Sequence, residues 1–138
     1  MKDIRVLIVD DLPQVRQGLT IMLELAARSA SPKVEVIGEA QNGIEAVQQA
    51  RTLHPDVILM DLEMPVMDGY EATRRIKAEQ PAARVIILSI HTSPEAQQRA
   101  RASGADGFVV KGDNGKILLN TILGKDGPQN SFERGEES

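Results

Sequence analysis

The sequence contains no cysteine, and aromatic side chains make up only 2% of its 138 residues. The absence of cysteine excludes disulfide bonds and thiolate metal sites, and it is typical of a cytoplasmic protein, which we expect this chain to be. Because aromatics are so scarce, the core must be built from Val, Ile, Leu, Met and Ala. The length fits one domain, which at this size buries roughly two-thirds of its unfolded surface.

Long apolar runs and runs of basic residues are also missing. No apolar stretch approaches the ~20 residues that a membrane span needs, and the charged start at residues 1–5 does not fit a secretory signal. The formal net charge is −4. We therefore expect a chain that neither crosses a membrane nor binds nucleic acid by itself.

Short β-branched apolar runs alternate along the chain with stretches of helical periodicity. The runs predict strands at residues 4–9, 34–38, 57–60, 85–88 and 107–110. The periodic stretches predict helices at residues 12–28, 43–53, 68–79, 94–103 and 114–123. This alternation predicts an α/β fold, a doubly wound parallel sheet with helices on both faces. Periodicity does not give the strand order, for which the flavodoxin-like order 2-1-3-4-5 is the common five-strand solution.

Local signals refine this prediction at three places. Asn42 is expected to cap the second helix, with Glu45 as its capping-box partner. The helix at 94–103 has few large apolar residues, so we expect it to be weakly stable. Residues 124–138 contain a single large apolar residue, Phe132. We therefore expect a folded domain over residues 1–123, followed by a disordered tail or the stub of a linker.

Polar side chains stand where four of the five predicted strands end. Asp10 and Asp11 follow the first strand, Asp61 the third, Ser89 the fourth and Lys111 the fifth. In open α/β sheets, ligands bind beyond the carboxyl ends of the strands, where the strand order reverses. We therefore expect these five side chains to meet in one site.

This set of side chains suits the reversible phosphorylation of a carboxylate. Three carboxylates close together repel one another, and Mg²⁺, which prefers oxygen ligands, removes that repulsion. A carboxylate can itself be the nucleophile and form an aspartyl phosphate. A lysine ammonium and a serine hydroxyl can then contact the phosphoryl oxygens, over which the transition state spreads negative charge.

Simpler interpretations exist for several of these acids and for the histidines. Taken alone, Asp10 and Asp11 would suit the capping of a helix N-terminus. Asp68-Gly69 is typical of a turn and a helix start, and His54, which precedes a proline, is expected to be structural. Neither histidine has the surroundings of a phosphotransfer residue, so we expect no phosphohistidine in this chain.

Four motifs extend this pattern over about residues 3–123. They are IVDDLPQVRQGL at 8–19, ILMDLEMPVMDGYEA at 58–72, VIILSIH at 85–91 and GADGFVVKG at 104–112. Together they resemble the receiver domain of bacterial two-component response regulators, with its CheY-like fold. The wording most resembles the LuxR/NarL/FixJ-type subfamily, which usually carries a C-terminal helix-turn-helix domain. The 15 residues from 124 to 138 are too few to form that domain.

The resemblance assigns a role to each acid of the site. Asp61 matches the phosphoacceptor, and Lys111 matches the lysine that contacts the phosphate. Asp10 and Asp11 match the metal-binding acids, which together with Asp61 and the backbone carbonyl of Glu63 bind Mg²⁺, with Mn²⁺ as an alternative ion.

The resemblance also implies a switch and two tuning positions. Ser89 matches the switch hydroxyl and Phe108 the switch aromatic, although Phe108 equally suits plain core packing. Glu63 and His91 flank the expected phosphoryl position, where they either tune the access of water or simply face solvent. The sequence departs from the family pattern twice. Gly112 stands where a proline often follows the lysine, and the switch aromatic is Phe instead of Tyr.

In function, the resemblance implies a phosphorylation switch and not an enzyme that acts on other molecules. A sensor histidine kinase would donate the phosphoryl group, and the output face would be formed by residues 94–103, 107–110 and 114–123, which could also form a homodimer after phosphorylation. Two alternatives stay open. One is a small aspartyl-phosphate phosphatase or phosphotransferase, weakly favoured by Glu63 two residues after Asp61. The other is a receiver-like interaction module that is never phosphorylated.

Overall fold

The computed structural model describes residues 3–29, 32–90, 93–112 and 115–124. The strands are β1 Ile4–Val9, β2 Val34–Ala40, β3 Val57–Asp61, β4 Arg84–Ser89 and β5 Gly107–Val110. The helices are α1 Pro13–Ala26, α2 Gly43–Leu53, α3 Gly69–Glu79, α4 Pro94–Ala102 and α5 Gly115–Leu123, and a 3-10 turn, η1, covers Ala27–Ser29. The predicted tail and His91 lie outside the described residues.

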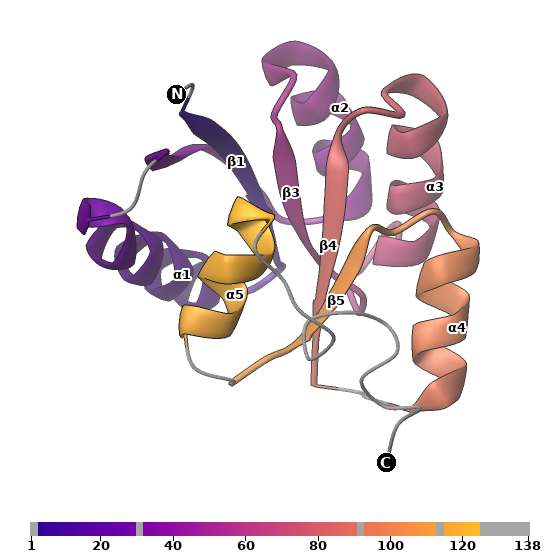
Figure 1. The fold of residues 1–138 in the computed structure, drawn as a ribbon. Coiled ribbons are helices and arrows are strands. Elements are labelled where there is room, and N and C mark those ends of the chain that lie inside the picture. The colour runs from indigo at the N-terminus through magenta and orange to yellow at the C-terminus, as the bar shows by residue number, and fades with distance from the viewer. Residues whose placement is uncertain (1–2, 30–31, 91–92, 113–114, 125–138) are drawn as a thin grey trace.

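The strands form one parallel sheet in the order β2-β1-β3-β4-β5, which confirms the predicted flavodoxin-like architecture. Helices α1 and α5 cover one face of this sheet, and α2, α3 and α4 cover the other (Figure 1). None of the helices in the described part of the chain has the length and apolarity of a membrane span. The carboxyl ends of the strands all point to one edge, because the sheet is parallel.

Each face of the sheet has its own aliphatic core. In β3, Ile58 and Met60 pack under α2 and α3, while Val57 and Leu59 pack under α1 and α5. All five residues of β3 are buried, as is typical of a central strand in a sheet covered on both faces. Among the described residues, Phe108 is the one buried aromatic side chain, and the partly buried Tyr70 packs against the same core, so the prediction of a largely aliphatic core is confirmed.

The second strand is longer than predicted. It continues beyond Gly38 to Ala40, because Glu39 and Ala40 still pair with the last two residues of β1. The register shifts by one residue between Val6 and Leu7, which places Gly38 inside the strand. The longer strand matters for the site, since it brings Glu39 level with the end of β1.

The start of α2 confirms the predicted cap with one difference. The Asn42 side chain accepts a hydrogen bond from the Glu45 amide at 2.9 Å. The Glu45 carboxylate, however, accepts from the amide of Gln41 at 3.3 Å, one residue before the cap. The capping box is therefore displaced by one residue.

Helix α4 is attached weakly, as its composition predicts. Ala100 is its only buried residue. The guanidinium of the exposed Arg99 lies 4.1 Å from the ring centre of the half-buried Tyr70 in α3, a cation–π contact. The helix ends before Gly104, which has a φ of +99°. A helix with so little buried surface can shift at small cost in free energy.

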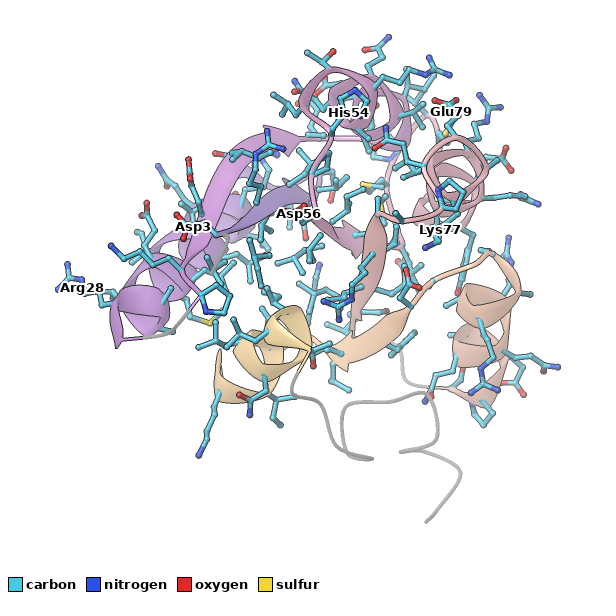
Figure 2. The ribbon with its side chains drawn as sticks, turned by 45° about the horizontal axis from the view of Figure 1, so that its top comes forward. Asp3, Arg28, His54, Asp56, Lys77 and Glu79 are labelled. Atoms are coloured by element: carbon cyan, nitrogen blue, oxygen red, sulfur yellow. The ribbon has the colours of Figure 1, made fainter. Side chains whose placement is uncertain are left out.

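His54 and Asp68-Gly69 are structural, as predicted. His54 ends α2 in the left-handed region, and its carbonyl accepts a hydrogen bond from Arg5 at 2.8 Å. Figure 2 shows His54 and Asp56 where the chain leaves α2 and enters β3, at the amino-terminal edge of the sheet. Asp68 caps α3, and the Gly69 amide donates to the Leu62 carbonyl at 3.0 Å.

Gly69 lies so close to the end of β3 that no side chain fits there. A Cβ at this position would lie 2.1 Å from the carbonyl oxygen of Asp61. Gly69→Ala should therefore lower the free energy of unfolding by about 1–3 kcal/mol, because α3 must move away from β3. The measurement is the urea midpoint of unfolding.

Gly18→Ala is the matched control, since Gly18 is exposed on α1 and its added Cβ would meet no atom within 4 Å. It should raise stability by up to about 1 kcal/mol, the difference in helix propensity. Equal midpoints for the Gly69→Ala variant and the unsubstituted protein would contradict the close approach.

Candidate functional site

The polar residues predicted at the strand ends meet at the carboxyl edge of the sheet. The Lys111 Nζ lies 2.8 Å from Asp10 Oδ2 and 3.2 Å from Asp61 Oδ1. The Lys111 amide also donates to the Ser89 carbonyl at 2.9 Å, which ties the end of β5 to the end of β4. A cavity of about 170 Å³ opens here, lined by Asp11, Leu12, Asp61, Glu63, Ser89, Ile90 and Lys111. The structure thus brings together the side chains that the strand ends and the motifs predicted to meet.

Every polar atom of Asp10 takes part in a hydrogen bond. It is 1% exposed. Its amide donates to the Ala40 carbonyl at 3.0 Å, and its Oδ1 accepts from the Leu12 amide at 3.0 Å. Its Oδ2 faces Lys111, and its carbonyl accepts from the Arg16 guanidinium at 2.7 Å. This residue is not the cap of α1, because the cap position is Leu12.

Three carboxylates share the cavity and could hold a metal ion. Asp10, Asp11 and Asp61 each offer an oxygen, and these oxygens lie within 4.8 Å of one another. A set of ligands made only of oxygen, next to an open cavity that admits water, fits Mg²⁺. Glu63, whose main-chain carbonyl the resemblance assigns to the metal, lines the same cavity.

The electrostatics of the cluster favour an added cation. Burial raises the pKa of Asp61, and repulsion from Asp10 and Asp11 raises it further, although Lys111 opposes both effects. Burial acts to lower the pKa of Lys111, but its hydrogen bonds and charge interactions with Asp10 and Asp61 outweigh that effect and raise the pKa. One ammonium thus offsets only part of the negative charge of three acids.

The two predicted switch residues are both buried. Ser89, the last residue of β4, is 3% exposed, and Phe108 is 6% exposed in the core beneath α2, α3 and α4. The phenyl ring of Phe108 is therefore inside, which supports its role in packing. Of the two predicted tuning positions, Glu63 lines the cavity and His91 lies outside the described residues.

The loop after Lys111 differs from the family pattern in its backbone as well as in its sequence. Gly112 has a φ of +91°. Proline fixes φ near −65°, so a proline could not adopt the conformation seen at this position. The glycine is therefore required by the loop that carries Lys111.

Sequence reasoning missed Arg16. Its guanidinium contacts the Asp10 carbonyl and the Glu39 carboxylate, on two different elements. Nothing in the local sequence indicates this, because Glu39 lies 23 residues away on a strand that was predicted to end at residue 38. A longer second strand would have placed Glu39 at the site.

Asp61→Asn should stabilise the fold near neutral pH. Because the folded-state pKa of Asp61 is raised, its carboxyl is protonated in both folded and unfolded states below the ordinary value of about 3.9 and then has no effect. As the pH rises through the folded-state pKa, the buried charge becomes a cost. The amide removes that cost, and we expect a gain of about 1 kcal/mol in unfolding free energy.

Urea midpoints measured at several pH values test this prediction, and the gain should shrink toward acid pH. Asp3→Asn is the control, because Asp3 is an exposed carboxylate outside the site, and its midpoint should not change. A midpoint for Asp61→Asn below that of the unsubstituted protein at neutral pH would contradict the net repulsion.

Comparison with known proteins gives a consistent family. The sequence matches the response regulator receiver domain over residues 6–123. It is 40% identical to a protein-glutamate methylesterase/protein-glutamine glutaminase of Symbiobacterium thermophilum over 127 residues. This aligned region covers 91% of this chain and 33% of that protein. It is 36% identical to the response regulator protein VraR of Staphylococcus aureus over 130 residues. This aligned region covers 94% of this chain and 60% of that protein. The chain thus spans less than two thirds of either relative.

Solved structures agree with this result. The response regulator domain of Thermotoga maritima CheB has a TM-score of 0.79 and 34% identity, over 89% of this chain and 96% of that one. The signal receiver domain of NarL from Mycobacterium tuberculosis has a TM-score of 0.78 and 32% identity, over 90% of this chain and 99% of that one. These relatives include LuxR/NarL-type regulators and chemotaxis proteins, and with the fold, the site and the matched motifs they show that the chain belongs to the response regulator receiver domain family.

Proposed function

We propose that Asp61 accepts a phosphoryl group from the phosphohistidine of a sensor histidine kinase and that the chain acts as a phosphorylation switch. The observation that carries this proposal is the ammonium of Lys111, which lies between the carboxylates of Asp10 and Asp61 in a cavity open to solvent. Such an arrangement provides one nucleophile, one fixed cation and two further acids for a metal.

Asp61 is suited to the nucleophilic step. An Asp61 carboxylate oxygen forms a bond to phosphorus while the bond from phosphorus to the donor's imidazole nitrogen breaks, and the imidazole leaves with the bonding electron pair and takes up a proton. Burial and neighbouring negative charge raise the pKa of Asp61, which makes its carboxylate the more basic nucleophile. Asp10, Asp11, Asp61 and the Glu63 carbonyl would hold Mg²⁺, or Mn²⁺ in its place, and the bound ion would supply positive charge to offset the negative charge on the transferred oxygens.

Lys111 and Ser89 act on the transferred group. The Lys111 ammonium exchanges its contact with Asp61 for a phosphoryl oxygen and keeps its hydrogen bond to Asp10. Ser89 ends the neighbouring strand and can donate its hydroxyl to a second oxygen. Glu63 and His91 are the positions that tune how water reaches the phosphoryl group, and slow hydrolysis there returns the carboxylate. The chain thereby catalyses only its own phosphorylation and dephosphorylation.

The output surface is formed by α4, β5 and α5. Ser89 at the end of β4 pairs with β5, which carries Phe108 under α4. A shift of Ser89 toward a phosphoryl group would be felt first by α4, because that helix has one buried residue. The same surface is the proposed site of a homodimer after phosphorylation.

The receiver unit over residues 1–123 would serve a larger signalling context. Both curated relatives are longer than this chain, and VraR is named a response regulator protein. We therefore infer that the chain works in the cytoplasm as the receiver unit of a two-component system. Its placement in the LuxR/NarL/FixJ-type subfamily, and with it a role in transcription regulation, rests on the likeness of motifs such as residues 104–112.

The decisive experiment adds beryllofluoride and Mg²⁺ to the ¹⁵N-labelled full chain and follows its amide spectrum. Relative to Mg²⁺ alone, we expect beryllofluoride to cause shifts around Asp61 and over α4, β5 and α5, and we expect no such further shifts in the Asp61→Asn variant. Acetyl phosphate with Mg²⁺ should add one phosphoryl group to the unsubstituted chain by mass spectrometry.

Each other outcome points to a different function. An unchanged spectrum in both proteins, with no added phosphoryl group, would overturn the proposal and leave an interaction module. Many turnovers on small phosphoesters would instead indicate a phosphatase with Asp61 as nucleophile and Glu63, which lines the same cavity, as general acid.

A further inference from the structure

A second layer of contacts lies behind the metal-binding acids. The side chain of Arg16 in α1 is 15% exposed, and its guanidinium makes two hydrogen bonds in different directions. Its Nε donates to Glu39 Oε1 at 2.7 Å, and its NH1 group donates to the carbonyl oxygen of Asp10 at 2.7 Å. One side chain of α1 therefore joins the edge strand β2 to the backbone at the end of β1.

These contacts fix the peptide plane between Asp10 and Asp11. The Asp10 amide donates a hydrogen bond to the Ala40 carbonyl of β2, and the Asp10 carbonyl accepts one from Arg16. Glu39, which holds Arg16, is the residue before Ala40 and pairs with Ile8 in the sheet. Because a peptide group is planar, fixing its carbonyl also fixes the amide and the Cα of the next residue. The point from which the Asp11 side chain leaves the backbone is set in this way.

Asp11 has little else to orient it. The described structure gives its side chain no hydrogen bond and no ion pair, whereas Asp10 is held by Lys111 and by the Leu12 amide. Its carboxylate is half-buried and is one of the three whose oxygens lie within 4.8 Å of one another. The position of the Asp11 carboxylate therefore depends on its backbone.

We propose that Arg16, held by Glu39, is a positioning residue for the metal-binding acids. By locking the Asp10–Asp11 peptide, it keeps both carboxylates directed at one ion before that ion arrives. The inference rests on the proposed function, since it concerns the Mg²⁺ site of that same switch. Side chains that orient metal ligands from behind commonly contribute a factor of about 10–100 to metal affinity.

An ordinary surface ion pair would not have this effect. The chain offers one for comparison, between Arg51 of α2 and Glu79 of α3. The Arg51 side chain is 58% exposed, and both of its hydrogen bonds go to Glu79, with none to the backbone of the site. Exposed pairs of this kind contribute about 0–1 kcal/mol to stability and nothing to a distant site.

The test measures Mg²⁺ affinity without any phosphodonor. The full chain is titrated with MgCl₂, and the amide shifts of Asp11 and Leu12 give the dissociation constant for each variant. Arg16→Ala should raise the Kd about 10-fold or more. Arg16→Lys, which keeps the charge but cannot reach both partners in the same geometry, should recover part of the loss. Glu39→Gln should raise the Kd less than Arg16→Ala, and the control Arg51→Ala should leave it unchanged.

The outcomes separate the inference from the function on which it rests. No Mg²⁺-dependent shift in the unsubstituted chain would count against the proposed function itself. If the unsubstituted chain binds Mg²⁺ and the Arg16→Ala and Arg51→Ala variants have the same Kd, only the positioning role would be overturned. If Arg16→Ala does not fold, Arg16→Lys and Glu39→Gln carry the comparison, and an unchanged Kd in both of them would also overturn it. Urea midpoints without Mg²⁺ show which variants are folded.

Discussion

The contact of the Lys111 ammonium with Asp10 and Asp61 is the interaction on which this site depends. Lys111 follows β5, Asp10 follows β1 and Asp61 ends β3, so the three residues reach one another only because the sheet is parallel and brings these ends to one edge. The contact also leaves part of the negative charge of the site uncompensated. One ammonium faces three acids, and burial with mutual repulsion raises the pKa of Asp61. That imbalance favours a second cation, and under the proposed function this cation would in turn offset the charge of a phosphoryl group.

Rigid and loose parts of the fold lie on either side of this contact. The central strand β3 is buried along its whole length. The Asp10 amide donates a hydrogen bond to β2, and its carbonyl accepts one from Arg16, which in turn contacts Glu39 of β2. Helix α4, in contrast, buries a single residue, Ala100, and its Arg99 stacks on Tyr70. A switch needs this difference, because charge placed at a rigid site transmits a shift only to elements that are held by little free energy. The loose helix lies directly over the core that contains Phe108.

Much of this could be predicted from the sequence, for reasons that are local. The buried strands are continuous apolar runs, and the acids, Ser89 and Lys111 stand immediately at their ends, so the parallel order places them together. What could not be predicted depends on distant partners or on backbone angles. The last residues of β2, Glu39 and Ala40, do not continue an apolar run, and only their pairing with β1 makes them strand. Arg16 has no local signal, and the left-handed backbone of Val66, at a φ of +72°, is not expected of a β-branched residue.

The burial of Phe108 bears on how a switch of this kind would work in this chain. A tyrosine at the same position would carry a hydroxyl that needs a partner, and this requirement can hold the ring at the surface in one state and inside in the other. The phenyl ring has no such group. Burying it gains roughly 1.5–3 kcal/mol, and the ring is inside at 6% exposure. Helix α4 buries a single residue, Ala100. Under the proposed function, we therefore expect the movement of that helix, more than a rotation of the aromatic ring, to report the state of Asp61.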